Sequence, residues 1–150
     1  MIDLPDTFEE VEVGDTFKLD DTYEVTESEI IEFAEQWDPQ PFHTDPAAAE
    51  DTMFEELVAS GWHVCAMAMR IMVDCLLSET GSEGAVGVDE LRWHEPARPG
   101  DILRIEIEVV EKRPWFGPHG VVKCLVEVYA SETLVLSYLG QVLWEREVEE

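Results

Sequence analysis

Residues 61–77, with the sequence GWHVCAMAMRIMVDCLL, constrain the fold more than any other segment. Over these residues, apolar side chains point in nearly every direction around a helix. Such a helix is either buried inside a protein or inserted in a membrane. The segment contains His63, Arg70 and Asp74 and is shorter than the roughly 20 apolar residues that cross a bilayer. It therefore predicts a central buried helix and no membrane association.

The chain after this helix has the period-two pattern of strands. In residues 102–110, for example, Leu103 and Ile105 alternate with Arg104 and Glu106. Turn sequences such as Arg98-Pro99-Gly100-Asp101 separate the apolar segments. The expected strands are residues 86–88, 91–93, 102–110, 121–130 and 134–144. Together they predict an antiparallel meander.

The first half of the chain is predicted to be mainly helical. Thr26 and Glu29 form a capping box, which starts a helix that should end near Trp37 because Pro39 disfavours helical geometry at Asp38. A loop over residues 39–46 and a short helix over residues 46–57, with Asp45 as its N-cap, should follow. Short strands are expected at 17–19 and 23–25. The chain is thus predicted to be one α+β domain, residues 1–150, in which an antiparallel sheet wraps round a central buried helix.

The charge of the chain excludes one class of function. The sequence has 35 acidic and 9 basic residues, a formal net charge of −26, with the acids spread over its whole length. This composition suits a protein that works in molar salt, where screening shortens the range of self-repulsion to about 3 Å. An acidic protein of a mesophile is the alternative. In either case the surface would repel nucleic acid in dilute salt, so nucleic-acid binding is not expected.

Cysteine usage and the amino-terminus indicate a cytoplasmic protein. The sequence has an odd number of cysteines, Cys65, Cys75 and Cys124, and their spacing does not match that of metal ligands. We therefore expect free thiols and no metal site. Residues 1–6 are acidic and lack the basic and apolar regions of an export signal.

Asp38 and His43 are the candidate catalytic residues. Their spacing alone has little value, because Asp89 and His94 have the same spacing. That second pair falls on a strand-like segment, where an odd separation places the side chains on opposite faces. Asp38 and His43 instead lie in a loop restricted by prolines, which can direct both side chains at one point.

This pair suits the addition of water to a conjugated thioester. A carboxylate and an imidazole can bind one water between them and remove its proton. The thioester carbonyl also needs an N–H donor, which Gly61 supplies at the start of the buried helix, where the helix dipole is favourable. Ser60 is a plausible N-cap and a possible supporting partner of Asp38 or of the water.

Each of these residues also has a purely structural explanation. Asp38 could cap the helix, His43 could be a surface loop residue, and Ser60-Gly61 could be an ordinary helix start. Trp37, Phe42 and Trp62 are core or pocket-lining residues. On the same reasoning His63 is a core histidine and His119 is solvated in a turn.

Three segments resemble a known family. Residues 33–45 (FAEQWDPQPFHTD) and 58–63 (VASGWH) are similar to the hydratase motif and helix entry of MaoC-like dehydratases, which include (R)-specific enoyl-CoA hydratases. Residues 92–101 (RWHEPARPGD) resemble that family's strand ending in a Pro-x-x-Pro-Gly-Asp turn. The resemblance extends from about residue 13 to residue 146.

The resemblance implies a hot-dog fold, usually as a homodimer with an acyl-CoA tunnel near the interface. It implies that Asp38 and His43 are catalytic, that Gly61 polarises the thioester, and that Gln40 and Ser60 support them. The hydratases commonly have a small residue before the aspartate and an aliphatic one before the histidine. The present Trp37 and Phe42 therefore suggest a reshaped pocket and put a straight-chain enoyl-CoA substrate in question.

The sequence thus predicts a cytoplasmic, cofactor-free hydratase or dehydratase that acts on an acyl-CoA thioester with (R) stereochemistry. Two alternatives remain open at this point. One is a hot-dog thioesterase, in which Asp38 activates water against the carbonyl and His43 has less to do. The other is a non-catalytic acyl-CoA-binding or regulatory domain.

Overall fold

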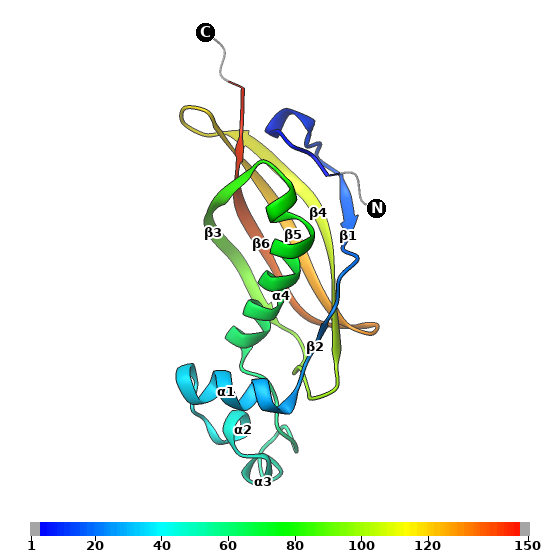
Figure 1. Ribbon diagram of the computed structural model, residues 1–150, viewed down its shortest axis with the longest axis vertical. Helices are drawn as coiled ribbons and strands as arrows, with labels where there is room; N and C mark the ends of the chain where they lie inside the picture. The colour runs from blue at the N-terminus through cyan, green and yellow to red at the C-terminus, as the bar shows by residue number, and fades with distance from the viewer. Residues whose placement is uncertain (1–3, 148–150) are drawn as a thin grey trace.

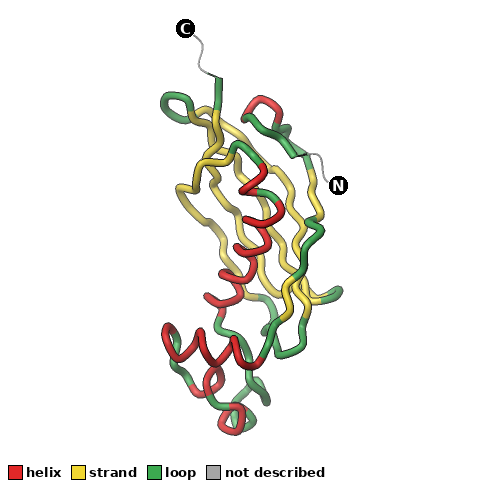
Figure 2. The backbone as a smooth tube through the Cα atoms, viewed as in Figure 1, coloured by secondary structure: helices red, strands yellow, loops and turns green. Residues whose placement is uncertain are grey.

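The fold consists of one antiparallel sheet, a long helix across its face, and a group of short helices at one end (Figures 1 and 2). The computed structural model describes residues 4–147, so the amino-terminal segment used for the localisation prediction lies partly outside the described residues. None of the helices within residues 4–147 is long and apolar enough to cross a membrane. The arrangement is the predicted α+β hot-dog fold.

Six strands form the sheet, in the order β1-β4-β5-β6-β3, with β2 also pairing with β4. Their bounds are β1 Thr16–Lys18, β2 Tyr23–Glu24, β3 Ser82–Trp93, β4 Ile102–Pro114, β5 His119–Ala130 and β6 Thr133–Glu145. The alternating pattern of β4 places Leu103, Ile105 and Ile107 in the core. β3 is longer than the two short strands expected from the sequence, and register shifts interrupt its pairing with β6. It forms one edge of the sheet.

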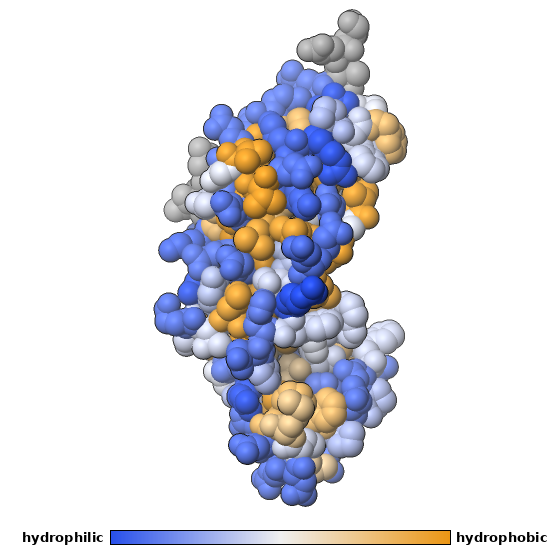
Figure 3. All heavy atoms as spheres, turned by 180° about the vertical axis from the view of Figure 1, so that it is seen from behind, coloured by the Kyte–Doolittle hydropathy of each residue, from blue (hydrophilic) through white to orange (hydrophobic). Residues whose placement is uncertain are grey.

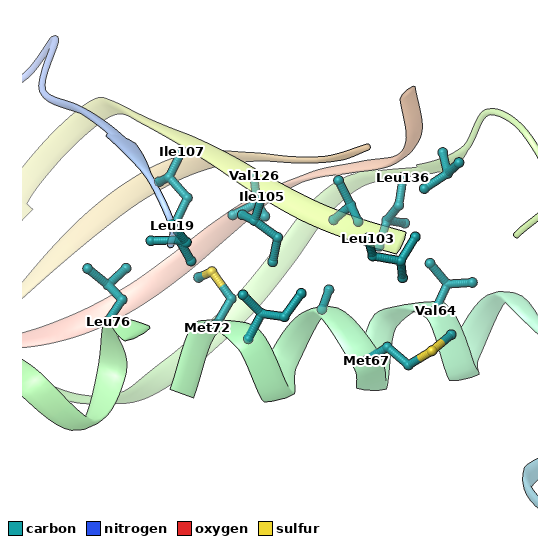
Figure 4. Packing of buried hydrophobic residues seen from close by; sticks show 14 of the residues in the cluster. Leu19, Val64, Met67, Met72, Leu76, Leu103, Ile105, Ile107, Val126 and Leu136 are labelled. Carbon is teal, nitrogen blue, oxygen red and sulfur yellow. The ribbon is translucent and has the colours of Figure 1, made fainter. Parts of the chain in front are cut away.

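The long helix α4, Gly61–Cys75, lies across the concave face of the sheet (Figure 1). Val64 and Met72 of α4 pack toward Leu103, Ile105 and Val126 of the sheet (Figure 4). The prediction of a central helix held against a sheet is confirmed. The side of α4 that carries Trp62, Met69 and Val73 is exposed in the single chain, although the sequence of the helix is apolar nearly all round.

The other α-helices lie beside the amino-terminal end of α4 (Figure 1), and two short 3₁₀ helices are η1, Phe8–Glu10, and η2, Leu77–Glu79, which follows α4. Helix α1, Glu27–Trp37, begins as predicted, with Thr26 Oγ1 accepting from the Glu29 N–H at 3.3 Å. The reciprocal half of the capping box is absent among the described contacts of Glu29, whose carboxylate accepts from the Tyr23 hydroxyl instead. The expected loop contains the short helix α2, Pro41–Thr44.

The predicted helix over residues 46–57 is wrong. Helix α3 covers only Pro46–Ala49, with Asp45 as its N-cap as expected. Thr52 Oγ1 donates to the Ala49 carbonyl and accepts from the Phe54 N–H, so its hydroxyl competes with helical hydrogen bonds. Glu55 then adopts a left-handed conformation, with φ of 63°. The chain therefore turns toward Leu57 rather than extending the helix.

Candidate active site

The first candidate residue, Asp38, lies where α1 ends. Its backbone N–H donates to the Ala34 carbonyl at 2.9 Å, and its own φ of −153° takes the chain out of the helix. The Gln40 side-chain amide donates to Asp38 Oδ1 at 2.6 Å. The Pro39 restriction at Asp38 and the Gln40 amide thus orient this carboxylate, as the sequence suggested for Gln40.

His43 is a buried residue of α2, the helix that Pro41 begins. Its Nδ1 lies 2.6 Å from the Val58 carbonyl oxygen. A carbonyl only accepts hydrogen bonds, so Nδ1 carries a proton and donates it. The Phe42 ring packs edge-on against the imidazole, with 4.5 Å between ring centroids. Together these contacts fix both the orientation and the tautomer of His43.

Asp38 and His43 face each other across a short gap. His43 Nε2 lies 3.3 Å from Asp38 Oδ2. In the neutral ring Nε2 has a lone pair, because the proton is on Nδ1. Two acceptors therefore converge at one point, and a single water can donate one hydrogen to each.

The local environment favours an ionised Asp38. Partial burial raises the pKa of Asp38, but the Gln40 hydrogen bond, the nearby Ser60 hydroxyl and the positive charge that His43 carries when protonated outweigh burial, so the pKa lies below its usual value. A carboxyl with a depressed pKa in the folded state contributes stability above its unfolded pKa, and this contribution is lost as the pH falls through the folded pKa. At neutral pH Asp38 is thus a carboxylate that can accept a proton.

The segment of residues 58–61 faces this pair. The Val58 N–H donates to the Phe42 carbonyl at 3.0 Å, and the Ala59 N–H donates to the Ala97 carbonyl at 2.9 Å. Ser60 is fully buried, and its hydroxyl has no hydrogen-bond partner among the described residues. The expected N-cap bond from Ser60 is not formed in α4. Its hydroxyl instead remains available beside Asp38.

Gly61 begins α4 at this point. The first N–H groups of a helix have no acceptor within the helix, and the first bond into α4 runs from the Val64 N–H to the Ser60 carbonyl. Gly61 therefore begins the helix where the sequence placed it, and its N–H lies at the positive end of the helix dipole.

A cavity of about 660 Å³ joins these groups. It is lined by residues of three separate parts of the chain, namely Asp38, Phe42 and His43; Met53, Phe54, Val58, Ala59, Ser60, Gly61, Trp62 and Val64; and Trp93, His94, Glu95, Pro96 and Arg98. Six of the residues singled out from the sequence therefore line one cavity: Asp38, Phe42, His43, Ser60, Gly61 and Trp62. Trp37 and Gln40 do not line it. Gln40 contacts the site through Asp38.

The placement of Trp37 in the pocket is wrong. Its side chain is 73% exposed and lines a different, shallow pocket with Phe33 and His63. Trp37 is still helical and shares a face of α1 with Phe33, four residues earlier, whereas the chain has left the helix at Asp38. The expected effect of Trp37 on the shape of the reactive pocket therefore does not arise, and that of Phe42 remains.

The second pair with the same spacing is not a site of this kind. Asp89 accepts from Gln141 Nε2 at 2.7 Å on β3, and His94 contacts Ser137 Oγ at 2.7 Å just after that strand. Each residue thus has its own partner on β6. His94 nevertheless lines the large cavity, which its place in the sequence did not suggest.

The other histidines have separate environments. His63 is buried and stacked on Phe33 at 4.6 Å, and its Nδ1 has no partner among the described residues, so it is not the satisfied core histidine expected. His119 pairs with Glu83 at 2.6 Å in place of the expected solvation. Within residues 4–147, no three His, Cys, Asp or Glu side chains converge as metal ligands.

One wall of the cavity was missed by sequence reasoning. It consists of Trp93 and the following residues, where Arg98 donates to Glu56 Oε1 at 2.6 Å and to the Phe54 carbonyl at 3.2 Å. Residues 92–101 carried a recognisable turn motif, but only the tertiary structure brings them to the start of α4.

The chain is similar to several known proteins. A MaoC-like dehydratase from Rhodospirillum rubrum superposes with a TM-score of 0.84 at 34% identity, covering 95% of this chain and 99% of that one. An R-hydratase from Pseudomonas aeruginosa superposes with a TM-score of 0.72 at 27% identity, covering 96% of this chain and 90% of that one. A 3-hydroxybutyryl-CoA dehydratase of Methylorubrum extorquens is 31% identical over 109 residues, which are 71% of this chain and 66% of that protein.

The family assignment follows from the extent of the sequence match. Residues 8–130 match the family described as the MaoC like domain, and this range includes the Asp38/His43 pair, α4 and the cavity wall. The chain therefore belongs to the MaoC-like dehydratase family.

Proposed function

We propose that this protein adds water to, or removes it from, an acyl-CoA thioester, interconverting an enoyl-CoA and a 3-hydroxyacyl-CoA. The observation that carries the proposal is the convergence of Asp38 Oδ2 and His43 Nε2, 3.3 Å apart, on a cavity that also contains the start of α4. Proton acceptors and a carbonyl-polarising donor are the groups that hydration of a conjugated thioester requires.

In the proposed mechanism Asp38 and His43 hold the water that reacts. Its oxygen attacks the β-carbon while Asp38 accepts a proton, assisted by the His43 ring. Electron density moves from the double bond to the thioester oxygen, which the Gly61 N–H stabilises. The proton taken from water is then delivered to the α-carbon, so the product contains one added water. No electrons leave the substrate, and the proposed reaction therefore uses no redox cofactor.

The CoA carrier and the (R) stereochemistry are the finer parts of the proposal. The carrier is supported by the similarity to the 3-hydroxybutyryl-CoA dehydratase. The stereochemistry is supported by the similarity to the R-hydratase. Phe42 and Phe54, with ring centroids 5.2 Å apart, form an apolar wall suited to the acyl portion.

Thioester hydrolysis is the second candidate reaction. Asp38 could activate water against the carbonyl, but His43 is held in the one tautomer that makes it a second acceptor for the same water. A hydrolase that relies on one carboxylate does not require this arrangement. A binding domain without catalysis would require neither group to be oriented.

One assay distinguishes the three functions. The purified protein in 2 M KCl is given crotonyl-CoA and a branched enoyl-CoA, while the enone absorbance and the free thiol are both followed. We expect loss of the enone without release of thiol, and (R)-3-hydroxy acid after hydrolysis and chiral chromatography of the product. Thiol release would instead identify a thioesterase. No change in either the enone absorbance or the free thiol over a range of acyl chains would contradict both enzymatic functions.

We also propose that the protein is a homodimer formed through β3 and α4. Both elements expose apolar side chains, Val86 and Val88 on β3 and Met69 and Val73 on α4, and β3 is an unpaired edge of the sheet. The face of the sheet that points away from α4 is largely hydrophilic, with some apolar patches (Figure 3).

Light scattering in molar salt tests the dimer. We expect a mass near twice the 17.1 kDa of one chain, and a shift toward the monomer in dilute salt, where the charge of −26 repels a second copy. Replacing Val88 with lysine should favour the monomer in molar salt as well. A monomeric wild-type protein under the same conditions would contradict the proposal.

A further inference from the structure

The indole of Trp93 makes two contacts with Gly61. Trp93 Nε1 donates to the Gly61 carbonyl oxygen at 2.9 Å. The indole also fills the place that a side chain at position 61 would occupy, since a Cβ built on Gly61 would lie 2.5 Å from Trp93 Cε2 and 2.6 Å from Nε1. Gly61 is thus held by the ring on one side and by a hydrogen bond through its carbonyl.

The start of α4 needs such a restraint. Glycine has the greatest backbone freedom of any residue, and α4 begins with one. The residue before it, Ser60, forms no side-chain hydrogen bond to cap the helix. A mobile helix end is a poor oxyanion site, because a donor stabilises developing charge best when it is already in place.

Trp93 is itself firmly anchored. It is the last residue of β3 and pairs with Leu136 of β6. Trp62 packs edge-on against it, with ring centroids 5.2 Å apart. Yet Trp93 is 46% exposed, so it is not a typical core residue, and it is one of the residues that line the cavity. Its position therefore serves the start of α4 more than the interior of the sheet.

We propose that Trp93 is a positioning residue that holds the Gly61 N–H, the proposed carbonyl-polarising donor, at the start of α4. Its ring fixes the Cα of Gly61, and thereby the direction of the Gly61 N–H. Its hydrogen bond to the Gly61 carbonyl restrains the same residue from the carbonyl side. This inference rests on the proposed function of the same site.

Replacing Trp93 with phenylalanine removes the indole N–H and keeps an aromatic ring. Loss of a complete oxyanion donor costs roughly 10²–10³-fold in kcat, and Trp93 acts one step away, so we expect about a 10-fold lower kcat with KM changed less than about twofold. A chromophoric arylacryloyl-CoA, whose absorbance moves to the red when its carbonyl is polarised, should show a smaller red shift when bound to W93F. The matched control is W115F, in the hairpin at the far end of the sheet, which should behave as wild type (Figure 1).

A double-mutant cycle tests the contact with the ring. Gly61→Ala in the wild-type background forces a Cβ into the indole and should lower kcat at least about 100-fold, because the tryptophan is not the loose end of a flexible chain. In a Trp93→Ala background the same change has room, and its additional cost should fall below about 10-fold. Equal costs in the two backgrounds would show that the ring does not restrain Gly61.

A third measurement is independent of substrate. In protein labelled with ¹⁵N-glycine, the Gly61 amide is identified by its loss in Gly61→Ala, and its ¹⁵N relaxation order parameter should be lower in W93F than in wild type. If wild type hydrates no thioester, the proposed function fails, and the order parameter still tests the restraint. Wild-type kcat, red shift and order parameter in W93F would overturn the inference.

Discussion

Replacing Asp38 with asparagine should lower kcat for enoyl-CoA hydration by about 10²–10⁴-fold, the usual contribution of a positioned acid–base group. The asparagine oxygen can still accept from Gln40, which bonds to Asp38 Oδ1 at 2.6 Å, so the fold should be preserved. The lost group is the negatively charged acceptor beside His43 Nε2. Steady-state kinetics at neutral pH, where Asp38 is ionised, measures the effect, and circular dichroism checks the fold.

Asp89→Asn is the matched control. Asp89 is exposed on β3 and accepts one hydrogen bond from Gln141, which asparagine can also accept through its side-chain oxygen. We expect kcat within about twofold of wild type, as for most surface substitutions. A loss at Asp89 comparable with that at Asp38 would show that the wrong carboxylate has been assigned to the reaction.

Replacing His43 with asparagine should lower kcat by at least about 100-fold with little loss of stability. The asparagine amide can take the place of Nδ1 and donate to the Val58 carbonyl, which His43 approaches to 2.6 Å. It cannot replace Nε2 as the second acceptor for water. Activity and thermal unfolding of the variant separate these two roles of the ring.

His43→Ala provides the comparison. It should lose similar activity and also about 1–3 kcal/mol of stability, because the buried Val58 carbonyl loses its side-chain donor. His119→Asn, in the β4–β5 hairpin at the other end of the sheet, should leave the activity unchanged (Figure 1). Wild-type activity in His43→Asn would rule out proton transfer by His43 and leave it an orienting role alone.

Local sequence signals predicted the parts of the fold that depend on neighbouring residues. Thr26 and Pro39 set the limits of α1, and the alternation of residues 102–110 predicted β4, because capping and pleat period act within a few residues. The length of the helix after Asp45 was not predictable in the same way. There the Thr52 hydroxyl takes the Ala49 carbonyl as its hydrogen-bond acceptor and so competes with the backbone bonds of the helix. The residues on either side of Thr52 favour a helix, so the sequence does not show where the helix ends.

The site was only partly predictable for a related reason. Asp38, His43 and Gly61 lie in motifs whose chemistry is visible in the sequence. Trp93 contributes to the site through a hydrogen bond to a residue 32 positions away, and such a contact depends on how β3 ends against α4. Trp37 was placed in the pocket by its adjacency to Asp38, but neighbours at the end of a helix point in different directions.

The segment of residues 58–61 has a consequence for redesign of the substrate range. The Val58 carbonyl holds the His43 ring, the Ala59 N–H donates to the Ala97 carbonyl, and Gly61 carries the amide proposed to polarise the thioester. A shift of this backbone would therefore disturb both the His43 ring and the proposed carbonyl donor at once, and substitutions near it should combine non-additively. Met53 and Phe54 line the same cavity from a separate turn. If the proposed reaction holds, we expect libraries directed at those two positions, with residues 58–61 left unchanged, to admit new acyl groups without loss of activity.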